Sequence, residues 1–162
     1  MNAPLRLAGR GRWRGDLVTW TISEGRRGRR WREVLTRDGA MLHSLLLETD
    51  PAGRFTHLEL AVAGVLVTLH PEGDGTLHGN RVDEAGAGVE HIEGLPFPDG
   101  SGVLVEGSPL GAAAVRWGHA TMGAVIDRAG RVRVGAFPDV AIATDEHGMP
   151  RLDDAATWPL ER

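Results

Sequence analysis

The chain of 162 residues contains no cysteine, no lysine and no tyrosine. Without cysteine it has no disulfide, no thiolate nucleophile and no Cys-ligated metal. Without lysine and tyrosine it forms no lysine Schiff base and has no phenolic acid for catalysis. These three absences exclude several classes of enzyme mechanism before any motif is considered.

Long hydrophobic runs are also missing. The opening residues, Met1 to Arg6, lack the apolar core of a secretory signal, and no later stretch approaches the roughly 18 apolar residues of a membrane span. We therefore expect a cytoplasmic protein without a transmembrane segment. The length suits one domain, and a content of 41% hydrophobic and 25% charged residues is typical of a folded globular chain.

Turn signals recur along the whole chain. They combine glycine, which adopts positive φ without strain, with aspartate, which bonds to its own backbone, at a spacing of roughly 8–15 residues. The signals lie at residues 24–28, 38–39, 50–53, 63–64, 71–75, 85–88, 99–102, 127–130 and 145–148. This pattern predicts one long antiparallel β meander.

Alternation between the turns predicts which side chains share a face of the sheet. In residues 16–24, Val18, Trp20 and Ile22 face one way, so Trp20 is a candidate for the core. The clearest hairpin joins residues 55–62 to residues 65–70. The segment 41–49 is apolar on both faces, which predicts a strand that lies centrally or lines a cavity.

The second half of the chain predicts more strands and little helix. Strands are expected at 103–106, 112–117, 121–126, 132–134 and 140–144, and a helix of little more than one turn at 109–115. Roughly ten strands exceed what a flat open sheet usually tolerates, so the sheet should curl into a barrel or half-barrel, or split into two layers. The expected fold is mainly β, with a partly ordered N-terminal arm at 1–12 and a single β domain at 13–162.

Charge is unevenly distributed along the chain. Residues 1–40 carry ten arginines against four acidic residues, a balance of +6, whereas the remaining residues have a balance of −10. The arginines interleave with Trp13 and Trp31, which suits RNA, an anionic glycolipid headgroup, or arginine stems that cover half-buried indoles. We favour the last interpretation, so nucleic acid is not expected as a partner.

Searches for catalytic and metal-binding patterns give weak signals. His57 with Glu59, and His91 with Glu93, would each be half of a metal site on a strand face, but such pairs are common on solvated strands. Ser108 precedes a proline and lies outside the Gly-x-Ser-x-Gly pattern of hydrolases. The sequence predicts no catalytic residue, no bound metal and no cofactor.

Two parts of the chain resemble a known family. Residues 47–62, followed by 88–97, and the tail at 137–158 are similar in order and spacing to a bacterial glycolipid-binding family of uncharacterised domains. The matching positions are Gly88, Glu90, Glu93 and Pro96, then Asp145, Gly148, Asp153 and Trp158. The resemblance covers roughly residues 13–158 and implies a long, curved antiparallel sheet, related in shape to lipoprotein carriers, that binds a glycolipid.

The leading hypothesis is therefore non-enzymatic binding of a small amphipathic ligand. Its acyl part would lie against leucines of the curved sheet and its head near charged residues. The predicted ligand-binding residues are Trp31, Leu45, Leu47, Leu58, Leu60, Glu90, His91 and Glu93.

Three alternatives stay open, and the sequence indicates neither the ligand nor the oligomeric state. One is a hydrolase-type enzyme that acts on a sugar or lipid ester through His91 and Glu93. Another is a lipocalin-like barrel, suggested by Gly11-Arg-Trp13. The third is a β interaction module that presents an exposed edge strand.

Overall fold

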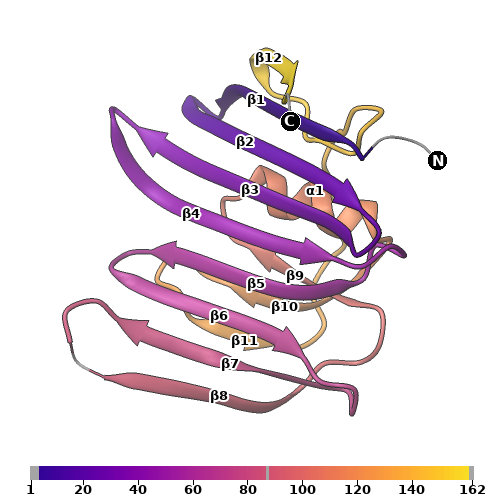
Figure 1. Ribbon diagram of the computed structural model, residues 1–162. Coiled ribbons are helices and arrows are strands. Elements are labelled where there is room, and N and C mark those ends of the chain that lie inside the picture. The colour runs from indigo at the N-terminus through magenta and orange to yellow at the C-terminus, as the bar shows by residue number, and fades with distance from the viewer. Residues whose placement is uncertain (1–3, 87, 161–162) are drawn as a thin grey trace.

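Nine strands form one antiparallel sheet, as Figure 1 shows. The computed structural model describes residues 4–86 and 88–160. The strands of this sheet are β1 (Arg6–Trp13), β2 (Asp16–Gly25), β3 (Gly28–Arg37), β4 (Ala40–Thr49), β5 (Phe55–Val62), β6 (Val65–Pro71), β7 (Thr76–Asp83), β8 (Val89–Pro96) and β12 (Asp153–Pro159). Their spatial order is β12-β1-β2-β3-β4-β5-β6-β7-β8, so the predicted meander is confirmed and its last strand returns to pair with β1.

The chain between β8 and β12 forms a second layer behind this sheet (Figure 1). It contains β9 (Ser101–Val105), α1 (Pro109–Trp117), β10 (Thr121–Ile126) and β11 (Val132–Val134). The three strands form a small sheet in the order β11-β10-β9. β9 and β10 are parallel because α1 crosses between them, an arrangement that the turn pattern did not predict.

The large sheet stays open, so the predicted barrel or half-barrel is wrong. β12 and β8 are its two edges, and they do not pair with each other. Buried side chains from the large sheet, the small sheet and α1 belong to one hydrophobic cluster. The second layer thus shields the apolar inner face of the large sheet from water. The sheet therefore does not need to curl around itself to bury that face.

Several segments differ from the sequence-based expectation. Residues 6–12, assigned above to the N-terminal arm, belong to β1, which pairs with both β2 and β12. Residues 112–117, expected as a strand, belong to α1. The segment 140–144 is irregular apart from one bridge between Thr144 and Pro150, and the final strand β12 was not predicted at all.

Helix α1 is longer than predicted because its start is well capped. Ser108 has an extended backbone and its side-chain oxygen accepts a hydrogen bond from the backbone N–H of Gly111 at 2.9 Å. Pro109 occupies the first helical position, where no N–H is needed. Gly111 therefore lies in the first turn, and the apolar residues after it continue the helix to Trp117.

Strand β4 lies in the middle of the nine strands, as its two apolar faces predicted. Leu45 and Leu47 point into the core and are 2% exposed. Leu46 is half-buried on the outer face, and Leu42, at a bulge in the pairing with β3, is half-buried against the core cluster. A central strand has neighbours on both sides, and this explains why apolar side chains are tolerated on both of its faces.

Three turns share one hydrogen-bonding pattern, in which an aspartate closes a five-residue loop. In each turn the aspartate carboxylate accepts backbone N–H bonds from the second and fourth residues after it, and the third residue is a glycine with φ between +78° and +84°. The turns begin at Asp50, Asp127 and Asp145. This pattern gives the Asp and Gly signals of the sequence a specific structural role.

A close backbone approach at Gly79 allows β7 to pack against β6. A Cβ atom built on Gly79 would lie 1.8 Å from the carbonyl oxygen of Thr68. The position is buried, and the pairing register between β7 and β8 shifts between Leu77 and Gly79. Only a residue without a side chain fits there without movement of the strands.

Replacement of Gly79 should destabilise the protein. We expect Gly79→Ala to lower the free energy of unfolding by about 1–3 kcal/mol, because the strands must move apart to make room. The matched control is Gly73→Ala, whose Cβ would meet nothing within 4 Å. Urea unfolding measures both, and equal stability of the two variants would contradict the close approach.

Acidification should abolish the contribution of the Asp127 turn to stability. The backbone N–H bond from Arg131 lowers the pKa of Asp127 below its ordinary value of 3.8, and the guanidinium groups of Arg131 and Arg133 act in the same direction. A lowered folded-state pKa means that the carboxylate stabilises the fold above the unfolded pKa and that this stabilisation is lost as the pH falls through the folded pKa.

Asp127→Asn keeps an oxygen acceptor but does not titrate. Its deficit in the free energy of unfolding, relative to the unmodified protein, should be largest at neutral pH and should shrink below about pH 4. Urea unfolding across this range measures the deficit. A deficit that is independent of pH would show that the Asp127 carboxylate has no altered pKa in the fold.

Candidate functional site

The five apolar residues predicted to contact a ligand lie inside the protein. Each is between 0 and 2% exposed and belongs to the core cluster: Trp31, Leu45, Leu47, Leu58 and Leu60. They occupy the inner face of the large sheet, beneath α1 and the small sheet. In this structure an acyl chain cannot reach them, because the protein's own second layer covers them.

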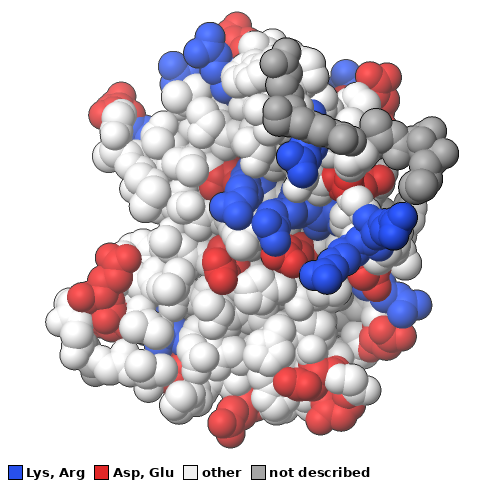
Figure 2. Space-filling view, in the orientation of Figure 1, with Lys and Arg blue, Asp and Glu red and all other residues white. Residues whose placement is uncertain are grey.

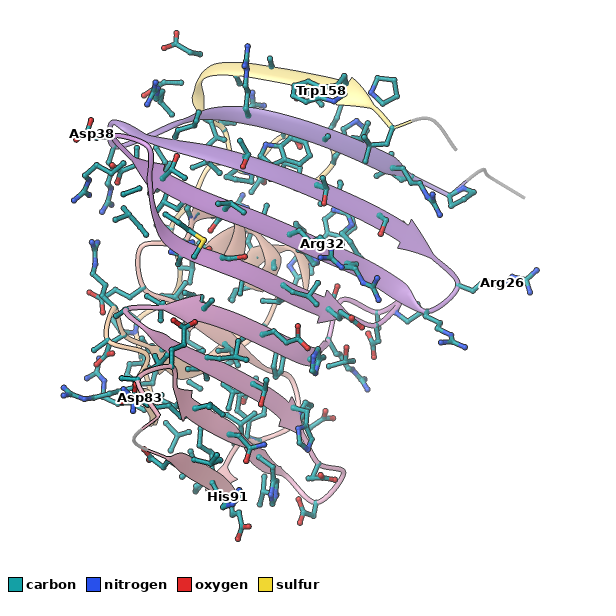
Figure 3. All side chains as sticks on the ribbon, turned by 60° about the vertical axis from the view of Figure 1, so that its left-hand side comes forward. Arg26, Arg32, Asp38, Asp83, His91 and Trp158 are labelled. Carbon is teal, nitrogen blue, oxygen red and sulfur yellow. The ribbon has the colours of Figure 1, made fainter. Side chains whose placement is uncertain are left out.

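The three polar residues predicted for the ligand head lie elsewhere, on the edge strand β8. Glu90, His91 and Glu93 are all exposed. His91 Nδ1 lies 2.8 Å from the side-chain oxygen of Asn80 on the neighbouring strand. Figure 3 shows His91 at the opposite end of the sheet from Trp158 of β12. The structure therefore does not bring these residues together with the buried leucines.

A buried carboxylate, which the sequence analysis missed, joins the two layers. Glu33 of β3 is 1% exposed, and one of its oxygens lies 2.6 Å from Nε2 of His43 on β4. The same oxygen accepts a hydrogen bond from the hydroxyl of Ser108 at 2.7 Å, and the other accepts one from the backbone N–H of Leu110 at 2.9 Å. Glu33 thus sits at the positive N-terminal end of α1.

This cluster contains a serine, a histidine and an acid, but its connections are not those of a hydrolytic triad. The Ser108 hydroxyl bonds to Glu33, and the histidine bonds to the same carboxylate rather than to the serine. A nucleophilic serine requires the histidine as its base. The cluster is also buried throughout, so it is a structural connection between β3, β4 and α1.

The sequence held a signal for this cluster. Glu33 alternates in register with Trp31 and Leu35, and His43 with Leu45, so both polar residues occupy positions that face the core. A charged residue at an inward position needs partners to satisfy it. Its main partner, Ser108, lies 75 residues further along the chain, and strand alternation says nothing about such a distant contact.

Arg29 forms a second connection between the layers. Its side chain is 3% exposed and its Nη2 lies 2.6 Å from the carboxylate of Glu24. The guanidinium carbon lies 4.8 Å from the ring centroid of Trp31 and 3.9 Å from that of Trp117 at the end of α1, and a further N–H donates to the carbonyl of His147. These contacts fix the guanidinium in place.

Beside Arg29 an open groove follows the β2–β3 turn. We call it the arginine groove; its volume is about 350 Å³, and its charged lining residues are Arg6, Glu24, Arg26, Arg27, Arg29, Arg30 and Glu48. Figure 2 shows basic side chains gathered over the first four strands, whereas the lower part of this face is mostly uncharged or acidic. Arg26 extends from the turn itself (Figure 3).

The arginines and the tryptophan that alternate along β3 point to opposite faces of the sheet. Arg30 and Arg32 are exposed on the outer face, whereas Trp31 between them is fully buried on the inner face. Trp31 therefore cannot stack on a base. At β3, the outer face of the sheet presents guanidinium groups to a ligand.

A second groove, which we call the apolar groove, lies over the small sheet. Its volume is about 390 Å³, and its lining comes from β1, β9, α1, β10 and the irregular segment 137–142. The larger apolar side chains in it are Trp13, Leu104, Val105, Met122, Val125, Phe137, Val140 and Ile142. Charged residues at the same groove are Arg14, Glu106 and Asp139.

Histidines of the outer face pair with nearby carboxylates. His57 lies 3.2 Å from Glu59, and His70 lies 3.1 Å from Glu72. Within residues 4–86 and 88–160, no group of three histidine or acidic residues is arranged to hold a metal ion. No helix in the same ranges is long and apolar enough to cross a membrane.

Comparison of the chain with protein-family models, with curated proteins and with solved structures finds no match. The resemblance to the glycolipid-binding family therefore stays a prediction. The two grooves and the buried clusters beside them are the features of the structure that bear on function.

The Glu33 carboxylate should be a major source of stability. We expect Glu33→Gln to lower the free energy of unfolding by about 3 kcal/mol, because an amide cannot accept from Ser108, Leu110 and His43 together. Glu59→Gln is the matched control, since Glu59 is exposed on the outer face of β5 and should change stability by less than about 0.5 kcal/mol. Similar losses in the two variants would contradict the bridging role of Glu33.

Proposed function

We propose that the protein is a non-enzymatic binding protein for an amphipathic molecule, whose apolar part lies in the apolar groove. The observation that carries this proposal is the lining of the groove, where apolar side chains from separate parts of the chain converge on an unfilled space. Its volume of about 390 Å³ falls within the usual range of small-molecule sites, roughly 300–1,000 Å³. Each methylene group buried there would contribute about 0.8 kcal/mol.

Arg14 is the cation among the lining residues of the groove and is the residue that suits an anionic head, whereas Glu106 and Asp139 bring the formal charge of the lining to −1. Arg14 lies in the β1–β2 turn with φ of +50°, and its guanidinium carbon is 5.5 Å from the ring centroid of Trp13. A ligand carboxylate or phosphate beside Arg14 would leave the acyl chain in contact with Trp13 and Phe137. This arrangement moves the predicted amphipathic ligand from the covered inner face to the opposite side of the small sheet.

The hydrogen bonds at the base of the groove favour binding over catalysis. Ser108 lines the groove, but its hydroxyl donates to Glu33 and its oxygen accepts from the backbone N–H of Gly111. His43 is held by the same carboxylate. Ser108 is therefore occupied as a helix cap and has no base to activate it.

A fluorescent fatty-acid analogue such as 11-(dansylamino)undecanoic acid tests this function. Its emission should rise on titration with the protein and fall when unlabelled fatty acid is added. Ala112→Phe should weaken binding at least tenfold, equivalent to about 1.4 kcal/mol, because Ala112 lines the groove and a phenyl ring would fill it. Ala143→Phe is the matched control, since Ala143 is exposed and lies outside the lining.

The control variant should bind the probe within a factor of about two of the unmodified protein. Arg14→Gln should weaken binding of the anionic probe more than binding of an uncharged dansyl alcohol of the same length. Absence of binding, or an equal loss in Ala112→Phe and Ala143→Phe, would contradict the assignment of the ligand to this groove.

A further inference from the structure

The arginine groove carries more positive charge than its own carboxylates neutralise. Five arginines and two glutamates leave its lining with a formal charge of +3. Glu24 pairs with Arg29 at 2.6 Å, and Glu48 pairs with Arg30 at 3.2 Å. Both carboxylates are therefore already engaged by arginines of β3.

Two further arginines of the groove have no partner among the residues that the structure describes. The side chains of Arg6, on β1, and Arg27, in the β2–β3 turn, make neither an ion pair nor a hydrogen bond within that part of the chain, and both residues are exposed. They come from separate strand ends but line the same space. Unpaired guanidinium groups that converge in this way attract an anion.

Arg29 supplies a fixed charge at the wall of the groove. Its contacts with the rings of Trp31 and Trp117 and with Glu24 hold the guanidinium in one position. Since the side chain is already ordered, little conformational entropy is lost when an anion binds beside it. The hydroxyl groups of Ser23 and Thr49 lie in the same lining.

The turn itself places two arginines at the groove. Arg26 and Arg27 are the two residues between the paired ends Gly25 and Gly28. Gly28 has φ of +114°, and a Cβ atom there would lie 1.9 Å from the carbonyl oxygen of Thr49. Gly28 is therefore packed tightly against the end of β4, and it anchors the turn that carries Arg26 and Arg27.

We propose that the arginine groove binds a phosphate group. Guanidinium groups present N–H donors in a planar fork that matches phosphate oxygens, and they stay charged at every physiological pH. A phosphomonoester carries up to two negative charges, which suits a lining of +3. This site is separate from the amphipathic ligand proposed above, since the two grooves share no lining residue.

The same chemistry is offered by a soluble phosphate and by the phosphate of a lipid headgroup, and two measurements distinguish them. Titration calorimetry with inorganic phosphate reports the soluble case. Cosedimentation with phosphatidylcholine vesicles, with and without phosphatidic acid, reports the headgroup case. We expect binding in at least one measurement, and it should weaken steeply between about 20 and 200 mM salt.

Charge-matched variants locate the site. Arg6→Gln combined with Arg27→Gln should weaken binding at least tenfold, because both unpaired guanidinium groups are removed. Arg10→Gln combined with Arg12→Gln removes the same charge from exposed positions of β1 outside the groove, and should change binding by less than about twofold. Thermal unfolding of each variant confirms that it is folded.

Each outcome decides the proposal. Binding of inorganic phosphate alone assigns a soluble ligand, and binding of phosphatidic acid vesicles alone assigns a headgroup. Absence of binding to both at low salt, or an equal loss in the two double variants, would overturn the proposal. Ala112→Phe should leave phosphate binding unchanged. The phosphate measurements therefore test this proposal independently of whether the apolar groove binds an amphipathic ligand.

Discussion

The Glu33 carboxylate is the interaction on which the two-layer arrangement depends. It accepts from the N-cap hydroxyl of Ser108 and the first-turn N–H of Leu110, and it lies within hydrogen-bond distance of the His43 ring, so one side chain joins two strands to one helix. Burial of a carboxylate costs several kcal/mol unless it is fully bonded. The sheet and the helix can therefore pack together only in the one register that satisfies it.

This packing decides which surfaces remain for ligands. The inner face of the large sheet is occupied by the second layer, and the two open grooves lie near opposite ends of β2. With ten residues, this strand is about 30 Å long. One groove presents guanidinium groups at the β2–β3 turn, and the other presents apolar side chains near the β1–β2 turn. The guanidinium groups and the apolar groove thus lie near opposite ends of the same strand.

Local patterns predicted most strands of the large sheet, because alternation and turn chemistry are properties of short segments. The central position of β4 followed from its leucines, and the Asp and Gly signals mark most of the turns of the large sheet, although not the β1–β2 turn at Arg14 and Gly15. Strand number left a two-layer arrangement open, but local patterns could not show which segments form the second layer or how it packs. The partnership of Glu33 with Ser108 spans 75 residues, and the crossover of α1 between parallel strands has no turn signal of its own. Because strand alternation shows an apolar inner face but not the layer that covers it, the sequence predicted a ligand where the structure has its core.

An open nine-stranded sheet has two free edges, and both carry negative charge. β8 contains Glu90 and Glu93 and ends at Pro96, and β12 contains Asp153 and Asp154 and ends at Pro159. Exposed edge strands are templates on which further copies of a chain can assemble into fibres. Here a β8 edge that approached the β12 edge of another molecule would meet carboxylates of the same sign, and the proline at the end of each strand offers no N–H. The acidic edges therefore oppose end-to-end growth of the sheet.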